Sequence, residues 1–349
     1  MILKPFFNEQ NPDTRKVGMW LLAVAALVFL MILVGGATRL TDSGLSMTDW
    51  QPISGTLPPL SAADWQAEFE AYQQFPEYQL LNPGMTLSEF KGIFWWEYSH
   101  RLLGRLIGLA FALPLLFFMA RRMIPAPMKI RMFVLLSLGA VQGLLGWYMV
   151  QSGLGSEPAV SHLRLLAHLS LALLLLSALL WTSGQILRAP VAGDGAGDAL
   201  KPFLGGFLFL VGIQVSLGVL VAGLDAGLIY NQWPAMGAGF IPGDLFGTAP
   251  WYSDATTVQF LHRITAYLVF IGALGLFFHI RRSGGPRCLF TLAHALLGLA
   301  AVQVILGILT LVWNVPVILG VLHQGFGILL FLMALYFLFA LQGENNVVL

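Results

Sequence analysis

The chain has one cysteine and few charged residues. The single thiol, Cys288, excludes an internal disulfide and any cysteine-rich metal site. Charged residues make up 10% of the 349, and a net charge of +1 gives no electrostatic attraction to nucleic acid. Hydrophobic residues make up 57%, more apolar surface than a soluble protein of this length can bury. The composition therefore predicts an integral membrane protein in contact with the lipid bilayer, with no nucleic-acid partner.

The amino terminus does not resemble a targeting segment. Residues 1–16 are polar and mixed in charge, unlike a cleaved signal peptide or an Arg/Ser-rich transit peptide. The first apolar run is therefore expected to remain in the protein as a membrane span.

Eight apolar runs are long enough to cross a hydrocarbon core of about 30 Å, which needs roughly 20 helical residues. The runs are continuous rather than alternating, which argues against a sheet. The expected fold is an all-α membrane protein with eight transmembrane helices, near 17–38, 97–120, 129–150, 163–187, 202–223, 257–280, 288–311 and 316–340.

Lysine and arginine gather on one side of these expected spans. They precede span one and lie between spans two and three, four and five, and six and seven, whereas the first and third loops on the other side are acidic. Because positively charged loops stay in the cytoplasm, both termini are expected to be cytoplasmic and the acidic loops to face outward. The basic residues are Lys4, Arg15, Lys16, Arg121, Arg122, Lys129, Arg131, Arg188, Lys201, Arg281, Arg282 and Arg287.

Four of the seven histidines start alternate spans at one depth, just inside the outer surface: His100, His168, His262 and His323. Each is followed four residues later, on the same helix face, by a small residue: Gly104, Ala172, Ala266 and Gly327. The small residues leave a groove in which a flat, bulky ligand fits. The other histidines are His162, His279 and His294, of which the first and last are interpreted as structural.

The sequence also contains an internal repeat. Val141–Gly146 matches Val302–Gly307, and the segments around His100 and His168 align with those around His262 and His323. Two pseudo-symmetric four-helix bundles with the same orientation are therefore expected. The first covers 1–190 and includes a long outer loop at 41–96. A Gly/Ala/Asp-rich linker at 191–201 joins it to the second, at 202–349.

Two imidazoles from facing helices at equal depth suit axial ligation of a haem iron inside a helical bundle. Zinc fits less well, because these sites contain no His-x-x-x-His pair and no cysteine cluster. No nucleotide cofactor is expected either. A single histidine on an apolar face is more often a structural residue, but four at one depth, duplicated in pairs, favour ligands.

The two halves differ at one position. Glu97 stands three residues before His100, whereas Gln259 stands three residues before His262. The sharper interpretation is a reactive first pocket and an electron-transfer site in the second half. The alternative is a surface carboxylate at a helix start, favoured by the helix dipole. Haem propionates would need cations near the outer face, and the candidates are Arg39, Arg101, Arg105, Arg164 and Arg263.

Three motifs carry a resemblance to a known family: Gly35–Ser46, Phe94–Arg105, and Leu224–Gly227 together with Asn231–Pro234. On these residues the chain resembles the haem A synthase family over essentially its whole length. It is most similar to the subfamily shared by alphaproteobacteria and mitochondria. The resemblance implies an oxidoreductase that converts the C8 methyl group of haem O to a formyl group by successive hydroxylations, giving haem A for cytochrome oxidase.

The resemblance also implies roles for individual residues. His262 and His323 would ligate a resident haem b, His100 and His168 would flank the substrate haem O, and Glu97 would be the essential acid. Some members carry a pair of cysteines in the outer loop, which this chain lacks, so its electron donor is unidentified. Other implied partners are the farnesyltransferase that produces haem O and cytochrome oxidase assembly factors. The implied location is the bacterial cytoplasmic (inner) membrane, with the haem sites toward the periplasm.

Two other functions would use the same histidines. A di-haem b-type electron-transfer protein, linked to quinol, would hold both haems permanently, and Glu97 would relay protons. A haem carrier would need a path to either side of the membrane and no acid. The haem extracted from the protein separates synthesis, which leaves haem A or a hydroxylated intermediate, from electron transfer, which leaves unmodified haem b.

Overall fold

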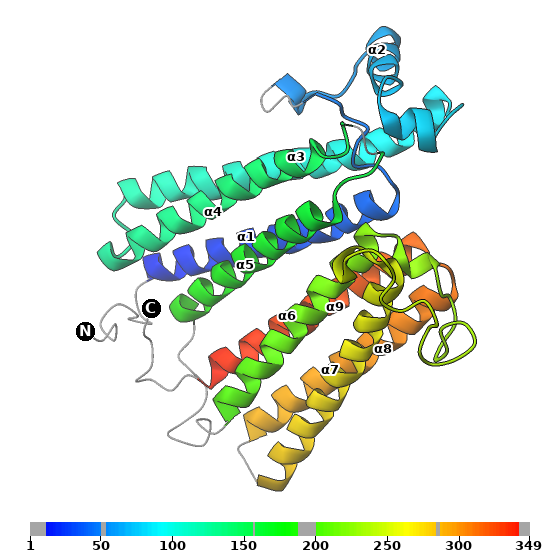
Figure 1. The fold of residues 1–349 in the computed structure, drawn as a ribbon. Helices are drawn as coiled ribbons and strands as arrows, with labels where there is room; N and C mark the ends of the chain where they lie inside the picture. Colours follow the sequence, from blue (N-terminus) through cyan, green and yellow to red (C-terminus); the bar gives the residue numbers. More distant parts are fainter. Residues whose placement is uncertain (1–11, 50–53, 156–157, 188–199, 284–286, 342–349) are drawn as a thin grey trace.

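The structure, a computed structural model, describes residues 12–49, 54–155, 158–187, 200–283 and 287–341 (Figure 1). This part of the chain contains eight helices long and apolar enough to cross a membrane and no β-strand, so the expected all-α membrane fold is confirmed. They are α1 (Pro12–Leu40), α3 (Leu87–Ala120), α4 (Ala126–Val150), α5 (His162–Leu187), α6 (Lys201–Gly223), α7 (Ala255–Ser283), α8 (Arg287–Val312) and α9 (Val317–Ala340). Nearly all of the expected linker at 191–201 lies outside the described residues, as do Lys4 and Arg188.

Helix α3 begins at Leu87 rather than near residue 97, where the apolar run starts. A capping box forms this start: the Thr86 side chain accepts from the Glu89 backbone N–H, and the Glu89 carboxylate accepts from the Thr86 backbone N–H. The last part of the expected loop at 41–96 is therefore helical. As a result, Glu97 lies in the third turn of a helix and not at its start.

The long helices pack in two groups. Buried side chains of α1, α3, α4 and α5 form one hydrophobic cluster, and those of α6, α7, α8 and α9 form a second. Contacts of α1 with α9 and of α5 with α6 join the groups (Figure 1). Within the groups, α7 packs closely on α8, whereas α3 makes far fewer contacts with α4.

The segment between α1 and α3 folds into a small structure of its own at one end of the bundle (Figure 1). It includes α2 (Ala62–Tyr72) and a turn of π-helix, η3 (Glu77–Leu81). A cluster of aromatic side chains attaches it to the start of α3, with Phe69, Tyr72, Phe90, Phe94 and Tyr98 buried. This segment therefore packs over the end of the bundle where His100 lies.

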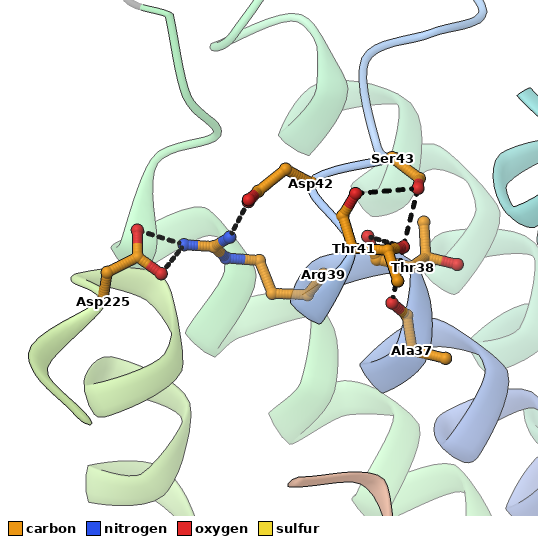
Figure 2. Close-up of polar contacts among 7 residues, drawn as sticks. All are labelled: Ala37, Thr38, Arg39, Thr41, Asp42, Ser43 and Asp225. Atoms are coloured by element: carbon orange, nitrogen blue, oxygen red, sulfur yellow. Dashed lines mark hydrogen bonds and ion pairs between the residues drawn. The ribbon is translucent and has the colours of Figure 1, made fainter. Parts of the chain in front are cut away.

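An ion-pair cluster joins the first helices of the two groups at that same end. Arg39, in the last turn of α1, donates to Asp42 at 2.6 Å and to both carboxylate oxygens of Asp225 at 2.8 Å (Figure 2). Asp42 and Asp225 each follow the end of their helix with a positive φ, of 47° and 50°. Arg39 thus connects two similar helix ends, one from each group.

Candidate functional site

His262 of α7 and His323 of α9 face each other in the second group of helices. Their ring centroids are 6.3 Å apart, with an angle of 79° between the planes. A metal–imidazole bond of about 2 Å, plus about 1 Å from nitrogen to ring centre, puts two axial imidazoles roughly 6 Å apart. Nδ1 of His323 is also buried without a hydrogen-bond partner among the described residues. The pair therefore fits axial ligation of one iron.

His100 of α3 and His168 of α5 form the corresponding pair in the first group. They lie near enough to interact electrostatically. Each of the four histidine rings packs against a glycine of a neighbouring helix, where a Cβ would come within 2.8–3.1 Å of a ring atom. These contacts join Gly35 to His100, Gly146 to His168, Gly218 to His262 and Gly307 to His323. The same His–Gly contact thus occurs twice in each group.

Glutamine side chains orient the rings. Nε2 of Gln214 lies 3.1 Å from Nδ1 of His262, and Nε2 of Gln142 lies 3.2 Å from Nδ1 of His168. The amide N–H of each glutamine donates to a ring nitrogen in these contacts, which holds the ring in place. Gln214 stands four residues before Gly218, and the residue four before Gly35 is Met31, which has no hydrogen to donate. In sequence, Met31 of α1 thus corresponds to Gln214 of α6, and its Cε would lie 3.0 Å from a Cβ at Gly104.

Glu97 is buried, with 3% of its surface exposed, so the alternative of an exposed carboxylate at a helix start is wrong. Oε2 accepts hydrogen bonds from the Ser46 hydroxyl at 2.7 Å and from the Met47 backbone N–H at 2.8 Å. Oε1 accepts two from Arg101, at 2.6 and 3.0 Å. Four hydrogen bonds, two of them from the Arg101 guanidinium, hold the Glu97 carboxyl group in place one helical turn from His100.

Gln259 has a similar position without the charge. Its Nε2 donates to the carbonyl oxygen of Tyr230 at 3.2 Å, and Arg263 donates to the same oxygen at 2.7 Å. Both Glu97 and Gln259 therefore connect the second helix of their group to the preceding loop, but only Glu97 forms an ion pair.

Most of the candidate propionate-binding arginines are engaged within the protein. Arg101 and Arg263 donate to loop carbonyls, at Met47 and Asp49 for the first and at Tyr230, Gln232 and Ala235 for the second. Arg164 lies over the ring of Tyr148 and donates a hydrogen bond to the backbone carbonyl of the same residue. Arg39 forms the ion pairs with Asp42 and Asp225 shown in Figure 2. These contacts give the four arginines structural roles in holding loops at the end of the bundle where His100 lies.

The remaining histidines lie apart from the two pairs. His162 begins α5 and contacts the Ser253 hydroxyl through Nε2 at 3.1 Å, which joins the two groups. Nδ1 of His294 on α8 contacts the Phe290 carbonyl at 2.7 Å. His279 lies near the far end of α7. The contacts of His162 with Ser253 and of His294 with Phe290 agree with structural roles for these two histidines.

The sequence did not reveal the glycines of neighbouring helices that contact the four histidine rings, nor the contact of Gln214 with His262. The repeat aligns Gln142 and Gly146 with Gln303 and Gly307, but it does not indicate which histidine of another helix they contact. Expected grooves beside Gly104 and Gly327 are also partly filled: Cβ positions there would lie 3.0 Å from Met31 Cε and from Gln303 Nε2.

Comparisons with known proteins identify relatives of this chain. The sequence model of a family described as cytochrome oxidase assembly protein matches residues 18–335. The heme A synthase of Bradyrhizobium sp. (strain BTAi1) is 46% identical over 326 residues, which cover 92% of this chain and 90% of the relative. The heme A synthase of Parvibaculum lavamentivorans is 44% identical over 333 residues, 94% and 95% of the two chains. That of Caulobacter vibrioides is 46% identical over 325 residues, 90% and 93%.

Proposed function

The chain belongs to the cytochrome oxidase assembly protein family, and we propose that it is a haem A synthase with one substrate pocket and one resident haem. The enzyme is an oxidoreductase that converts haem O to haem A by oxidising the C8 methyl group to a formyl group. The observation that carries the proposal is the pair of facing imidazoles of His262 and His323, together with the His–Gly contacts that occur in both groups of helices.

His262 and His323 would hold a resident haem b in the second half. Support comes from the 6.3 Å separation of their rings and from Gln214, which lies against His262. When bound, haem b would supply one-electron transfer. His100 and His168 would flank the haem O substrate in the first half.

Small residues make the first half more suitable for a ligand that enters and leaves. Gly108 of α3 and Gly139 and Gly143 of α4 face open space, as do Gly205, Gly206, Gly275 and Gly298 of the second group, so the first half differs in its sparse contacts between α3 and α4. The repeat places Phe270, Ala300 and Val304 at the positions of Gly108, Gly139 and Gly143 in the second half. Together with the sparse contacts between α3 and α4, the missing side chains leave room beside His100 and His168 for a bulky substrate.

Filling this space is expected to impair the substrate pocket alone. Gly108→Phe, which copies Phe270, should lower the rate of haem O conversion at least tenfold because the ring occupies the substrate's space, while haem b content stays at the wild-type level. The measurement is turnover together with the absorbance of bound haem b. Gly298→Phe on α8, also at a glycine facing open space, is the matched control and should leave conversion unchanged. Normal conversion by Gly108→Phe would contradict the proposed pocket.

Glu97 provides electrostatic stabilisation in the first pocket. Oxidation of a methyl carbon develops positive charge on that carbon, and a carboxylate held by fixed donors stabilises such charge without reorganising. The low dielectric of a membrane site strengthens this effect relative to water. Ser46 and Arg101 hold the carboxylate in place through the hydrogen bonds described above.

The orientation follows from charge. Basic residues cluster at the ends of helices remote from the four histidines, which favours cytoplasmic termini and haem sites toward the periplasm. Haem O reaches the protein from the farnesyltransferase that makes it, and haem A passes on to cytochrome oxidase assembly. The electron donor acts without an outer-loop disulfide, because the chain has a single cysteine.

The function is tested by supplying haem O to the purified protein with a reductant and oxygen and separating the extracted haems by chromatography. Haem A or a hydroxylated intermediate is the expected product. Two equivalents of unmodified haem b with no conversion would instead support the di-haem electron-transfer protein and contradict the proposal.

A further inference from the structure

A cleft of about 420 Å³ opens on α8 at the end of the bundle remote from the segment that contains α2 (Figure 1). It is lined by Arg287, Phe290, Thr291 and His294, which lie on one face of the helix because they are three or four residues apart. Gly307, which packs on His323, lies about 30 Å further along α8 from Arg287. The cleft is therefore separate from the two histidine pairs.

The cleft lies at the level of the lipid headgroups. Helix α8 has 26 residues, which gives a length of about 39 Å, whereas the hydrocarbon core is about 30 Å thick. The first turns of the helix therefore extend into the headgroup region. Arg287 is the first residue of α8, and its side chain is exposed, as are those of Thr291 and His294. These side chains are thus accessible to lipid from outside the bundle.

The surroundings of the cleft are positively charged. Helices α7, α8 and α9 contain no Asp or Glu, so Arg287 has no carboxylate partner on any of them. Two more arginines, Arg281 and Arg282, lie in the last turn of α7, which packs on α8. Basic clefts of this kind beside membrane-spanning helices attract the anionic headgroups of phospholipids.

Contacts within the protein hold the deeper side chains of the cleft in place. The Thr291 hydroxyl donates to the Arg287 carbonyl at 3.1 Å, and Nδ1 of His294 contacts the Phe290 carbonyl at 2.7 Å. The His294 ring also packs edge-on against Phe277 of α7, with ring centroids 4.7 Å apart. The cleft thus has a fixed inner wall, and the long side chain of Arg287 is its cation.

The repeat shows that the deeper polar positions belong to the second half alone. At the four positions of the cleft, in the same order, α4 has Ala126, Lys129, Ile130 and Phe133. Ile130 and Phe133 are 74% and 51% exposed, as expected of side chains that contact lipid chains. Polar side chains on such a face are costly in lipid unless they meet a polar ligand. Thr291 and His294 therefore indicate a ligand that the first half does not bind.

We propose that this cleft binds one anionic phospholipid from the leaflet remote from the four histidines. Arg287 binds the phosphate group, for which a guanidinium has the matching geometry. Thr291 and His294 contact the polar glycerol ester region below the phosphate, and the acyl chains lie along the apolar surface of α8. The proposal is independent of the haem chemistry proposed above.

The test uses the full-length protein, reconstituted into bilayers of equal parts dioleoyl phosphatidylglycerol and dioleoyl phosphatidylcholine. Native mass spectrometry after transfer to detergent counts bound lipids and chain copies together. We expect the wild-type protein to retain one phosphatidylglycerol in preference to phosphatidylcholine. Arg287→Gln should lower this retention about fivefold, the contribution of one basic residue near an anionic lipid surface. Thr291→Ile, which copies Ile130, should lower it about threefold by removing a hydrogen-bonding group.

The matched control is Arg121→Gln. Arg121 follows α3 at the same end of the bundle, is exposed and does not line the cleft. This variant should retain as much phosphatidylglycerol as the wild type. Equal losses in Arg121→Gln and Arg287→Gln, or wild-type retention in Arg287→Gln, would overturn the proposal. Equal retention of the two lipids by the wild-type protein would also overturn it.

Two other outcomes would assign the cleft to a different occupant and so contradict the proposal. Displacement of the bound phosphatidylglycerol by millimolar inorganic phosphate would identify a site for the free ion. A dimer without lipid that Arg287→Gln converts to monomers would identify a second copy of the chain. Circular dichroism checks that each variant is folded, and Thr291→Ile provides the test should Arg287→Gln fail to fold.

Discussion

Glu97→Gln is expected to lower the rate of haem O oxidation by about a hundredfold or more, while the protein stays folded and keeps its haem b. Removing one preorganised electrostatic group costs on the order of 10²–10³ in rate. The amide is nearly isosteric, and Gln259 occupies the corresponding place in the second half, where it is accommodated beside Arg263. The measurement is haem A formed per enzyme, with haem b absorbance as the check on folding.

A purely structural role of Glu97 predicts different relative rates for the variants of this site. Glu97 also anchors the Ser46–Met47 turn, and a loss of that anchor alone would slow the enzyme indirectly. Ser46→Ala removes one anchoring hydrogen bond but keeps the charge, so its rate should fall only a few-fold. Equal losses in the two variants would assign Glu97 to the loop, and a normal rate in Glu97→Gln would exclude any catalytic role.

His262→Ala is expected to abolish the absorbance of the resident haem b. The substitution removes one of the two histidines proposed to hold the haem iron and leaves His323 alone, so the affinity for haem b should fall sharply. His100 and His168 belong to other helices and should still bind added haem O. Optical spectra of the purified variant, before and after addition of haem O, check both statements.

The matched control for this variant is His294→Ala on α8. His294 packs edge-on against the Phe277 ring and lies outside both histidine pairs, so its loss should leave haem b in place. Unchanged haem b in His262→Ala, or equal losses in the two variants, would contradict the proposed division between resident and substrate pockets.

The sequence was sufficient to predict the membrane-spanning helices, because burial in lipid demands continuous apolar runs about as long as the bilayer is thick. It was less informative where polar residues extend a helix beyond the bilayer. Helix α3 continues outward to Leu87 on the strength of the Thr86–Glu89 capping box, a local signal that hydropathy does not register. The apolar run alone placed Glu97 at the start of a helix. In the structure, Glu97 lies in the third turn of α3 and is buried.

The candidate site was predictable to the extent that it repeats. The duplicated histidines identified the four candidate ligands, and the Glu97/Gln259 difference identified the asymmetric position. Contacts between helices could not be derived in this way, since nothing in one helix indicates which residue of another faces it. Gln214 beside His262, the glycines against each ring and the partners of Arg39 all depend on helix packing.

The proposal that His262 and His323 hold a resident haem is tested most directly by electron paramagnetic resonance. Spectra of the oxidised wild-type protein and of two single variants are compared. We predict a low-spin ferric signal of bis-imidazole haem in the wild type and in His168→Ala. This signal should be absent in His323→Ala. A signal that survives in His323→Ala, or that disappears in His168→Ala, would contradict the assignment of the resident haem to His262 and His323.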